Sequence, residues 1–456
     1  MAFFLFALVL LLTYLRPVET FIPELAESRI VLITSVIAVL AGLFSQLANK
    51  QKVFDRVHVT LLTLFMLFIF ASQATRGWLG GAIDAILEFS VNAVFFLLVC
   101  WNVNSFKRLR ITAALLVFSA IVLAGASVLA FHTGFMADRL ISRQSKASDD
   151  SLISDAMLAI LSPTDDFNDV WLWRIKSLGF LSDPNDFAQF LIVAVVLCVA
   201  FFNRKKLLSS TLLLTPLISI LLYAIYLTQS RGALVGLGAF IFILGVKRFG
   251  IGKMTALFTP FVLVALQYSI VAGRGFSASE ESAGGRIVAW SEGLTMLKQY
   301  PIFGVGYNSF LDHHNYTAHN AFVLCFAELG LLGYFAWLGL IVFIFLQLKA
   351  AAELSKNSLS PTDQRWINSV QIVIAVFLVC SLFLSRTYSP TLYILLALGA
   401  VAARFGGVIP NVRPTTGVGG TFSLSHWMRI SLITLFSTIL LVMGIVRVYW
   451  LTAGGP

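Results

Sequence analysis

Long apolar runs separated by short polar segments dominate this chain of 456 residues. A helix that crosses a membrane needs roughly 17 to 25 mostly apolar residues. Applied along the sequence, that length predicts about thirteen spanning helices. They lie near 3–15, 30–46, 59–73, 84–101, 111–131, 187–202, 209–228, 232–246, 254–272, 330–348, 367–384, 389–403 and 430–451.

Composition identifies the solvent that these runs face. The chain is 58% hydrophobic, only 12% charged, and contains 40 Phe. That much apolar surface exceeds what one aqueous core can bury. We therefore expect an all-α polytopic integral membrane protein with about 12 to 13 transmembrane helices, the first of them retained rather than cleaved as a signal peptide.

The formal net charge of +10 comes from short basic clusters between apolar runs, and no basic helix that would bind nucleic acid is evident. Lys and Arg collect in alternate loops, which the positive-inside rule places in the cytoplasm. The N-terminus is then also inside and the C-terminus outside. Eighteen basic residues fall on that side: Lys50, Lys52, Arg56, Lys107, Arg108, Arg110, Arg204, Lys205, Lys206, Lys247, Arg248, Lys253, Lys349, Lys356, Arg365, Arg404, Arg413 and Arg429.

Two long segments, 132–186 and 273–329, lie on the opposite, outer face. They divide the chain into N-terminal helices (1–131), a first long loop (132–186), central helices (187–272), a second loop (273–329) and C-terminal helices (330–456). The stretch from Gly284 to Trp337, which includes most of the second loop, concentrates an arginine, three histidines and a Gly-x-Gly-Tyr turn. We expect the second loop to be the catalytic loop.

The cytoplasmic loops contain neither a phosphate-binding Gly-Lys-Ser/Thr loop nor an Asp-x-Asp pair that could hold a metal-bound nucleotide. The four cysteines are isolated along the chain, which favours packing over redox or metal roles. We therefore expect no cofactor.

Two arginines on the outer face are candidate anion ligands. Arg231 lies in the Ser230-Arg231-Gly232 turn between two spans, where it either reaches the lipid headgroups or binds an anion. Arg286 follows a Gly pair and begins an amphipathic stretch with Trp290, which suits a short helix at the membrane surface.

Downstream, Gly304 and Gly306 form a turn followed by Tyr307, and His313, His314 and His319 come next. The spacing of the histidines permits a metal site, with Asp312 and Glu328 nearby, but we expect none. His319 precedes Asn320 at the start of an apolar helix, where it is either an interfacial residue or a base, because an imidazole with its ordinary pKa near 6.5 suits general-base catalysis at neutral pH.

These motifs, in this order, resemble the C-terminal signature of the O-antigen ligase and O-antigen polymerase superfamily. The matching residues lie between about 180 and 340, and Asp183-Pro184-Asn185-Asp186 is similar to a motif of the exopolysaccharide branch. The signature comprises Arg286 with Trp290, Pro301-x-Phe303-Gly304-x-Gly306-x-x-x-Phe310, His319-Asn320-x-Phe322 and Glu328-Leu329-Gly330-x-x-Gly333, preceded by Ser230-Arg231-Gly232.

The resemblance implies a bacterial inner-membrane enzyme whose active site faces the periplasm. Such an enzyme transfers a glycan from undecaprenyl diphosphate to an acceptor hydroxyl, without metal and with inversion. The acceptor is lipid A core in a ligase, or another lipid-linked glycan in a polymerase. By motif position, Arg231 and Arg286 would hold the diphosphate and His319 would take the acceptor proton. Trp290, Gly304, Gly306, Tyr307, Asn320 and Glu328 would bind substrate.

A flippase or transporter of lipid-linked sugars is the alternative from a different class. Such a protein would be expected to carry charges inside its spans and to consist of two related halves. Here the candidate residues cluster in outer loops and no internal repeat is evident, so a transferase is favoured.

The predicted orientation can be tested by labelling. In a background without native cysteines, single cysteines at Ser145 and Ser277 should react with a membrane-impermeant maleimide in cells whose outer membrane is permeable, because both long loops lie opposite the basic loops. Labelling that requires a broken inner membrane would reverse the orientation.

Overall fold

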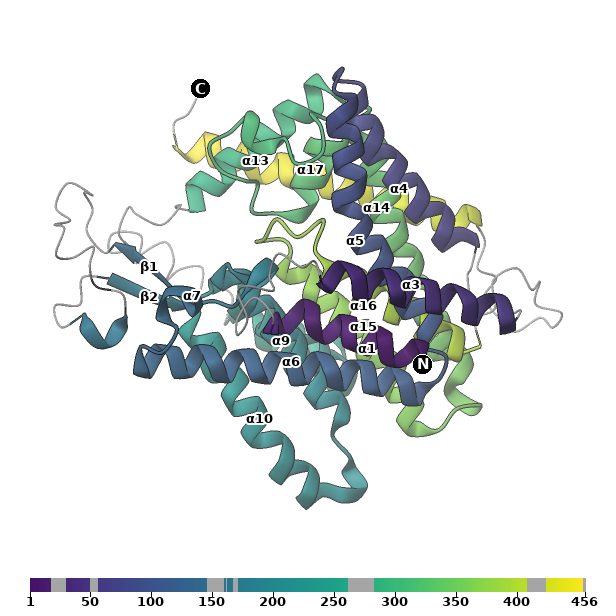
Figure 1. Ribbon diagram of the computed structural model, residues 1–456. Helices are drawn as coiled ribbons and strands as arrows, with labels where there is room; N and C mark the ends of the chain where they lie inside the picture. Colours follow the sequence, from purple (N-terminus) through teal and green to yellow (C-terminus); the bar gives the residue numbers. More distant parts are fainter. Residues whose placement is uncertain are drawn as a thin grey trace. The chain divides into compact units, whose positions relative to one another are not determined.

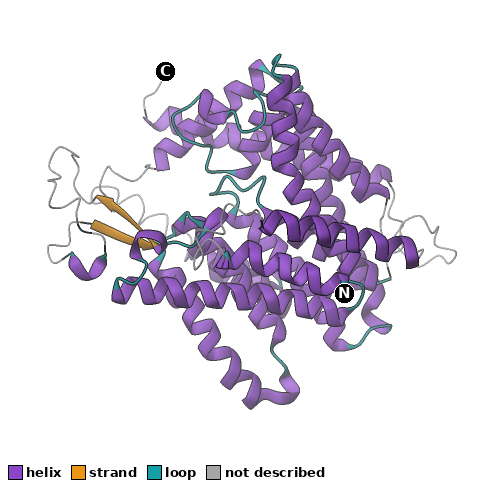
Figure 2. Ribbon diagram, viewed as in Figure 1, coloured by secondary structure: helices purple, strands orange, loops and turns teal. Residues whose placement is uncertain are grey.

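The computed structural model describes residues 1–17, 30–49, 56–145, 160, 162–166, 171–260, 283–407 and 424–453. Helices make up most of this part of the chain (Figure 2). The chain separates into two compact units. The first unit contains 1–116, 284–374 and 381–456, and the second contains 117–283 and 375–380.

The first unit is built around α14, which packs against α4, α16 and α17 (Figure 1). Helix α5 lies against α4 and α16, and α1 pairs with α3. The helices of this unit are α1 (Ala2–Leu15), α3 (Ile30–Asn49), α4 (Arg56–Ala74), α5 (Leu79–Asn102), the start of α6 (Phe106–Thr133), α13 (Ala283–Gln299), α14 (Ala321–Leu354), most of α15 (Pro361–Cys380), α16 (Pro390–Phe405) and α17 (Leu424–Ala453), with 3-10 turns η6 (Phe310–Asp312) and η7 (Ser355–Asn357).

The second unit is organised by α9, which packs against α10 and α11 and is buried along nearly its whole length. Strands β1 and β2 form a small antiparallel sheet in which Ile141 pairs with Ile175. Its elements are the rest of α6, α7 (Ala137–Leu140), β1 (Ile141–Ser145), η3 (Pro163–Asp165), β2 (Trp171–Ile175), η4 (Gly179–Leu181), α9 (Pro184–Phe201), η5 (Arg204–Lys206), α10 (Leu207–Leu227) and α11 (Arg231–Phe249).

The all-α polytopic membrane fold is confirmed. Within the described residues, nine helices are long and apolar enough to cross a membrane, and each overlaps a predicted span. Two shorter apolar helices, α1 and α16, match the predictions at 3–15 and 389–403. The span predicted at 254–272 lies mostly outside the described residues.

Some boundaries differ from the sequence prediction. Helix α14 begins at Ala321 rather than near 330, whereas α13 lies where a short helix was predicted within the second loop. Helix α15 ends at Cys380 rather than near 384, so Ser381–Ser389 is a loop. The first long loop contains the β1–β2 sheet, which the sequence did not predict.

Candidate active site

The centre of the candidate site is a break in α14. Gly330 has φ 63° and ψ −167°, which no helical residue adopts. A break in a membrane helix leaves backbone groups that lipid cannot satisfy. Here the amides of Leu331 and Leu332 lose the carbonyls of Ala327 and Glu328, their helical partners four residues earlier.

The turn after α13 satisfies all four of these backbone groups. The amides of Val305 and Gly306 donate to the carbonyls of Ala327 and Glu328, at 2.9 and 3.0 Å. In return, the amides of Leu331 and Leu332 donate to the carbonyls of Pro301 and Ile302, at 2.8 and 3.4 Å. The 301–306 turn therefore lies directly against the broken helix.

Glycine is required on both sides of this contact. Gly304 has φ 70°, and a Cβ there would lie 2.3 Å from the carbonyl carbon and oxygen of Glu328. A Cβ on Gly330 would lie 2.4 Å from the carbonyl of Ile302. Gly306, with φ 113°, faces the side chain of Gln73. These glycines thus allow a backbone path that a residue with a side chain would obstruct.

Glu328, a residue of α14, holds the rest of the loop in place through two hydrogen bonds. Its side chain is buried, with Oε1 accepting from the amide of Phe310 at 3.2 Å and Oε2 from the hydroxyl of Tyr388 at 2.8 Å. Burial raises the pKa of the Tyr388 hydroxyl well above its ordinary value, as does the Glu328 charge. Tyr388 is therefore held as a hydrogen-bond donor.

Tyr307 is buried beside Tyr388, with ring centroids 4.5 Å apart. Burial raises the pKa of its hydroxyl, and nearby carboxylates raise it further. Its amide donates to Ser72 Oγ at 3.0 Å, and Gln73 Nε2 donates to its carbonyl. The end of α4 therefore holds this part of the loop in place.

His319 lies two residues before the start of α14 and has a left-handed backbone, with φ 45°. Asn320 is the N-cap, and its Oδ1 accepts from the amides of Phe322 and Val323 at 2.9 and 3.2 Å. On the other side of His319, the indole Nε1 of Trp290 donates to the carbonyl of Ala318 at 2.9 Å. A left-handed backbone costs a non-glycine residue roughly 1–2 kcal/mol, so these contacts hold His319 in an unfavourable conformation.

The contact between Trp290 and the carbonyl of Ala318 also locates Arg286, because both Trp290 and Arg286 belong to α13. Helix α13 is confirmed over the amphipathic stretch, and Arg286 lies in its first turn. Residues four apart share one helix face, so Arg286 lies one turn from Trp290 on the face that reaches Ala318. Gly293 of α13 packs on α14, because a Cβ there would lie 2.6 Å from the side chain of Val323. Trp290 thus joins α13 to the residue before His319, and Arg286 lies one helical turn from Trp290 in the same unit.

Arg231 belongs to the second unit, where it begins α11 and is exposed. The turn before it is confirmed, with Gln229 at φ 53°. Arg174 of β2 joins this turn to the Asp-Pro-Asn-Asp motif, since its Nε donates to the carbonyl of Thr228 and its Nη2 to Oδ1 of Asn185, both at 2.9 Å. The carboxylate of Asp183 caps α9 in the same motif.

The other two histidines differ from His319 in their surroundings. His313 is exposed, and Nδ1 of His314 lies 2.9 Å from the carbonyl of Tyr316, two residues along the same loop. Among the residues that the structure describes, no three His, Cys, Asp or Glu side chains gather in a way that could hold a metal ion.

Sequence reasoning missed the residues that support the loop from elsewhere in the first unit. The 381–389 loop supplies Tyr388, the carbonyl of Ser381, which accepts from the amide of Ala321 at 2.8 Å, and the hydroxyl of Thr387, which donates to the carbonyl of Ala321 at 2.6 Å. Ser72 and Gln73 come from α4. The available signal was polarity, because each group is a short polar run at the end of an apolar one.

Comparison with known families agrees with these motifs. Residues 216–338 match the family model described as O-antigen ligase. That region includes Arg231, Arg286, His319 and the broken part of α14, and it confirms the resemblance that the motifs indicated. The match supports a role in cell-surface polysaccharide biosynthesis. No curated protein matches the chain significantly.

The contact between the 301–306 turn and the break in α14 can be tested by replacing single glycines with alanine. Gly304→Ala and Gly330→Ala should each lower the free energy of unfolding by about 2–4 kcal/mol, because each adds a left-handed residue and a backbone clash. The measurement is thermal unfolding of the purified protein in detergent. Gly444→Ala in α17 is the matched control, since no atom lies within 4 Å of the added Cβ. Wild-type stability of both variants would refute the packing described.

Proposed function

We propose that this chain, whose residues 216–338 match the O-antigen ligase family, transfers a glycan from undecaprenyl diphosphate to an acceptor hydroxyl at the periplasmic face of the bacterial inner membrane. The observation that carries the proposal is His319, held in a left-handed backbone between a capped helix and the Trp290 contact. Strained residues of this kind concentrate at functional sites.

The reaction needs one base and charge stabilisation. An acceptor hydroxyl is a poor nucleophile, and a general base raises its reactivity. A neutral His319 would take the hydroxyl proton as the oxygen attacks the anomeric carbon from the side opposite the diphosphate, which inverts that centre. The bond to the diphosphate breaks, and polyprenyl diphosphate leaves with the electron pair. This scheme uses no metal or other cofactor.

Both candidate arginines suit the departing diphosphate. Arg231 and Arg286 each lie in the first turn of a helix, α11 and α13. The amides at a helix N-terminus favour an anion and disfavour a cation, so an arginine there is stabilised when an anion is bound. Guanidinium groups also form two-pronged hydrogen bonds with phosphate oxygens.

The remaining candidate residues fit a supporting role in the proposal. Trp290 positions the residue before His319 and Asn320 caps the helix that follows it, while Gly304, Gly306, Tyr307 and Glu328 shape the loop. Of this set, Trp290 is the side chain that the structure leaves partly exposed, so we assign it the substrate contact.

Ligase and polymerase use the same chemistry and differ in the acceptor. Deletion of the gene followed by gel analysis of the surface glycan separates them. Loss of all glycan from lipid A core indicates a ligase, and core capped with single repeats indicates a polymerase. Loss of surface glycan with the lipid-linked donor retained on the cytoplasmic face of the inner membrane, rather than accumulating on its periplasmic face, indicates the flippase alternative.

If both arginines bind the diphosphate, replacing either with lysine should lower glycan transfer even though the positive charge is kept. Arg231→Lys and Arg286→Lys should each lower transfer roughly 10- to 100-fold, because lysine lacks the planar fork. Transfer is measured in the deletion strain complemented with each variant, at equal protein level. Arg248→Lys and Lys298→Arg, in the last turns of the same two helices, are the matched controls. Normal transfer by the lysine variants would return both arginines to a headgroup role.

The base assignment predicts a separate result for His319. His319→Asn should lower transfer by about 100- to 10,000-fold. Asn tolerates the left-handed backbone but cannot accept a proton at neutral pH, so stability should change little. His313→Ala and His314→Ala should have mild effects. Full activity of His319→Asn in the same assay would remove the base assignment.

A further inference from the structure

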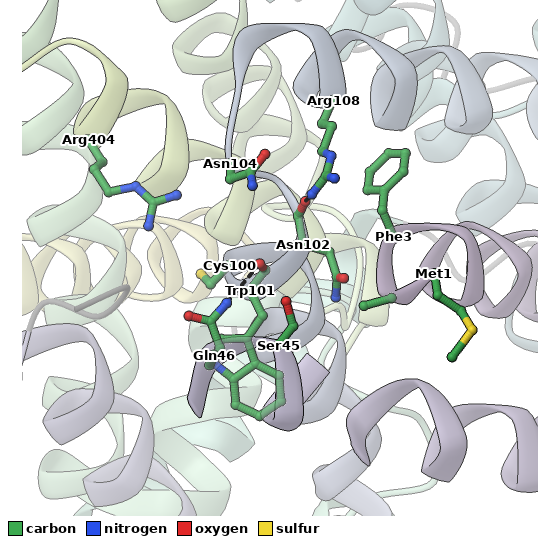
Figure 3. Close-up of a pocket in the computed structure, with 11 residues that line it drawn as sticks. Met1, Phe3, Ser45, Gln46, Cys100, Trp101, Asn102, Asn104, Arg108 and Arg404 are labelled. Carbon is green, nitrogen blue, oxygen red and sulfur yellow. Dashed lines mark hydrogen bonds between the residues drawn. The ribbon is translucent and has the colours of Figure 1, made fainter. Parts of the chain in front are cut away.

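A second polar site in the first unit is formed by residues other than those of the candidate active site. It is a cavity of about 110 Å³, well above the roughly 10–15 Å³ that one water needs. Its walls come from the start of α1, the end of α3, the end of α5 with the link to α6, Arg108 of α6 and Arg404 of α16 (Figure 3).

The charge of this cavity is positive. Arg108 and Arg404 approach it from two sides with Asn104 between them (Figure 3). None of the eleven described residues that line it is acidic. Arg110, two residues after Arg108, is paired with the carboxylate of Asp363, and neither residue lines the cavity. The site therefore suits an anion.

The end of α5 holds the polar side chains in place. Gln46 Nε2 donates to the carbonyl of Trp101 at 3.0 Å, and Arg108 Nη1 to that of Asn102 at 2.9 Å. Arg404 Nη2 donates to the carbonyl of Val103 at 3.3 Å. Capping the helix is the simpler role for these groups, but it uses one donor of the five on Arg108. Side chains already ordered in this way lose little entropy when a ligand binds.

A phosphate group suits these donors. Guanidinium groups form two-pronged hydrogen bonds with phosphate oxygens, and Arg108 keeps donors beyond its contact with the carbonyl of Asn102.

The surroundings favour a lipid as its source. Leu43, Phe44 and Leu47 flank Ser45 and Gln46 on α3, and their side chains are 42%, 69% and 67% exposed. In a membrane protein such a surface faces acyl chains. Basic pockets between membrane helices bind anionic headgroups.

We propose that this cavity binds the phosphate of an anionic phospholipid. Arg108 and Arg404 contact the phosphate, and the acyl chains lie along α3. The orientation predicted from the basic loops places this site on the cytoplasmic side, where no step of the proposed reaction occurs.

The test is thermal unfolding of the purified full-length protein in neutral detergent with phosphatidylglycerol, phosphatidylcholine or inorganic phosphate added. Phosphatidylglycerol should raise the melting midpoint by a few degrees, and phosphatidylcholine should not. Arg108→Gln and Arg404→Gln should each remove at least half of that shift. Lys107→Gln, one position from Arg108 and outside the cavity, should keep it.

The other outcomes are also decisive. A shift of equal size with inorganic phosphate alone, lost in the same two variants, supports the site and assigns it to a soluble phosphate. Equal stabilisation by both lipids, or an equal loss in Lys107→Gln, overturns it. If neither arginine variant folds, native mass spectrometry of the wild-type protein decides, because retention of phosphatidylglycerol no better than of phosphatidylcholine contradicts the proposal.

Discussion

Four backbone hydrogen bonds across the break in α14 are the constraint on which the candidate site depends. Lipid cannot satisfy an open amide or carbonyl, so a membrane helix can break only where other protein groups or water satisfy the freed amides and carbonyls. The 301–306 turn does this with two donors and two acceptors. The turn cannot move away without exposing those groups, and it therefore fixes where the chain goes next.

The loop that carries His319 comes directly after this turn. Its path is set at one end by the Gly304 contact and inside by Glu328, which joins Phe310 of the loop to Tyr388 of a second loop. At the other end, Asn320 caps the start of α14. The loop thus begins and ends on the same helix. This closed arrangement explains how a strained His319 can persist on an otherwise irregular segment.

The sequence predicted the membrane class, most spans and the short helix at Arg286, because apolar run length and periodicity are local properties. It also found the glycines, although for a different reason than the structure gives. Gly304 and Gly330 are close because one turn replaces the bonds of a distant helix, and no local pattern carries that information. The same holds for Ser72, Gln73 and Tyr388. The start of α14 was missed because a polar residue, Glu328, lies inside the helix. The end of α15 was missed because apolar residues continue past it, to Leu384.

The proposed chemistry uses an imidazole and no metal, and a pH–rate profile of the purified protein with a polyprenyl-diphosphate-linked donor tests this most directly. With EDTA present throughout, transfer should proceed at full rate near neutral pH. The rate should fall as pH drops through the range in which imidazoles titrate, because the base must be neutral to accept a proton. Loss of activity in EDTA with rescue by a divalent ion, or a rate that does not change across that range, would contradict the assignment of His319 as a metal-independent base.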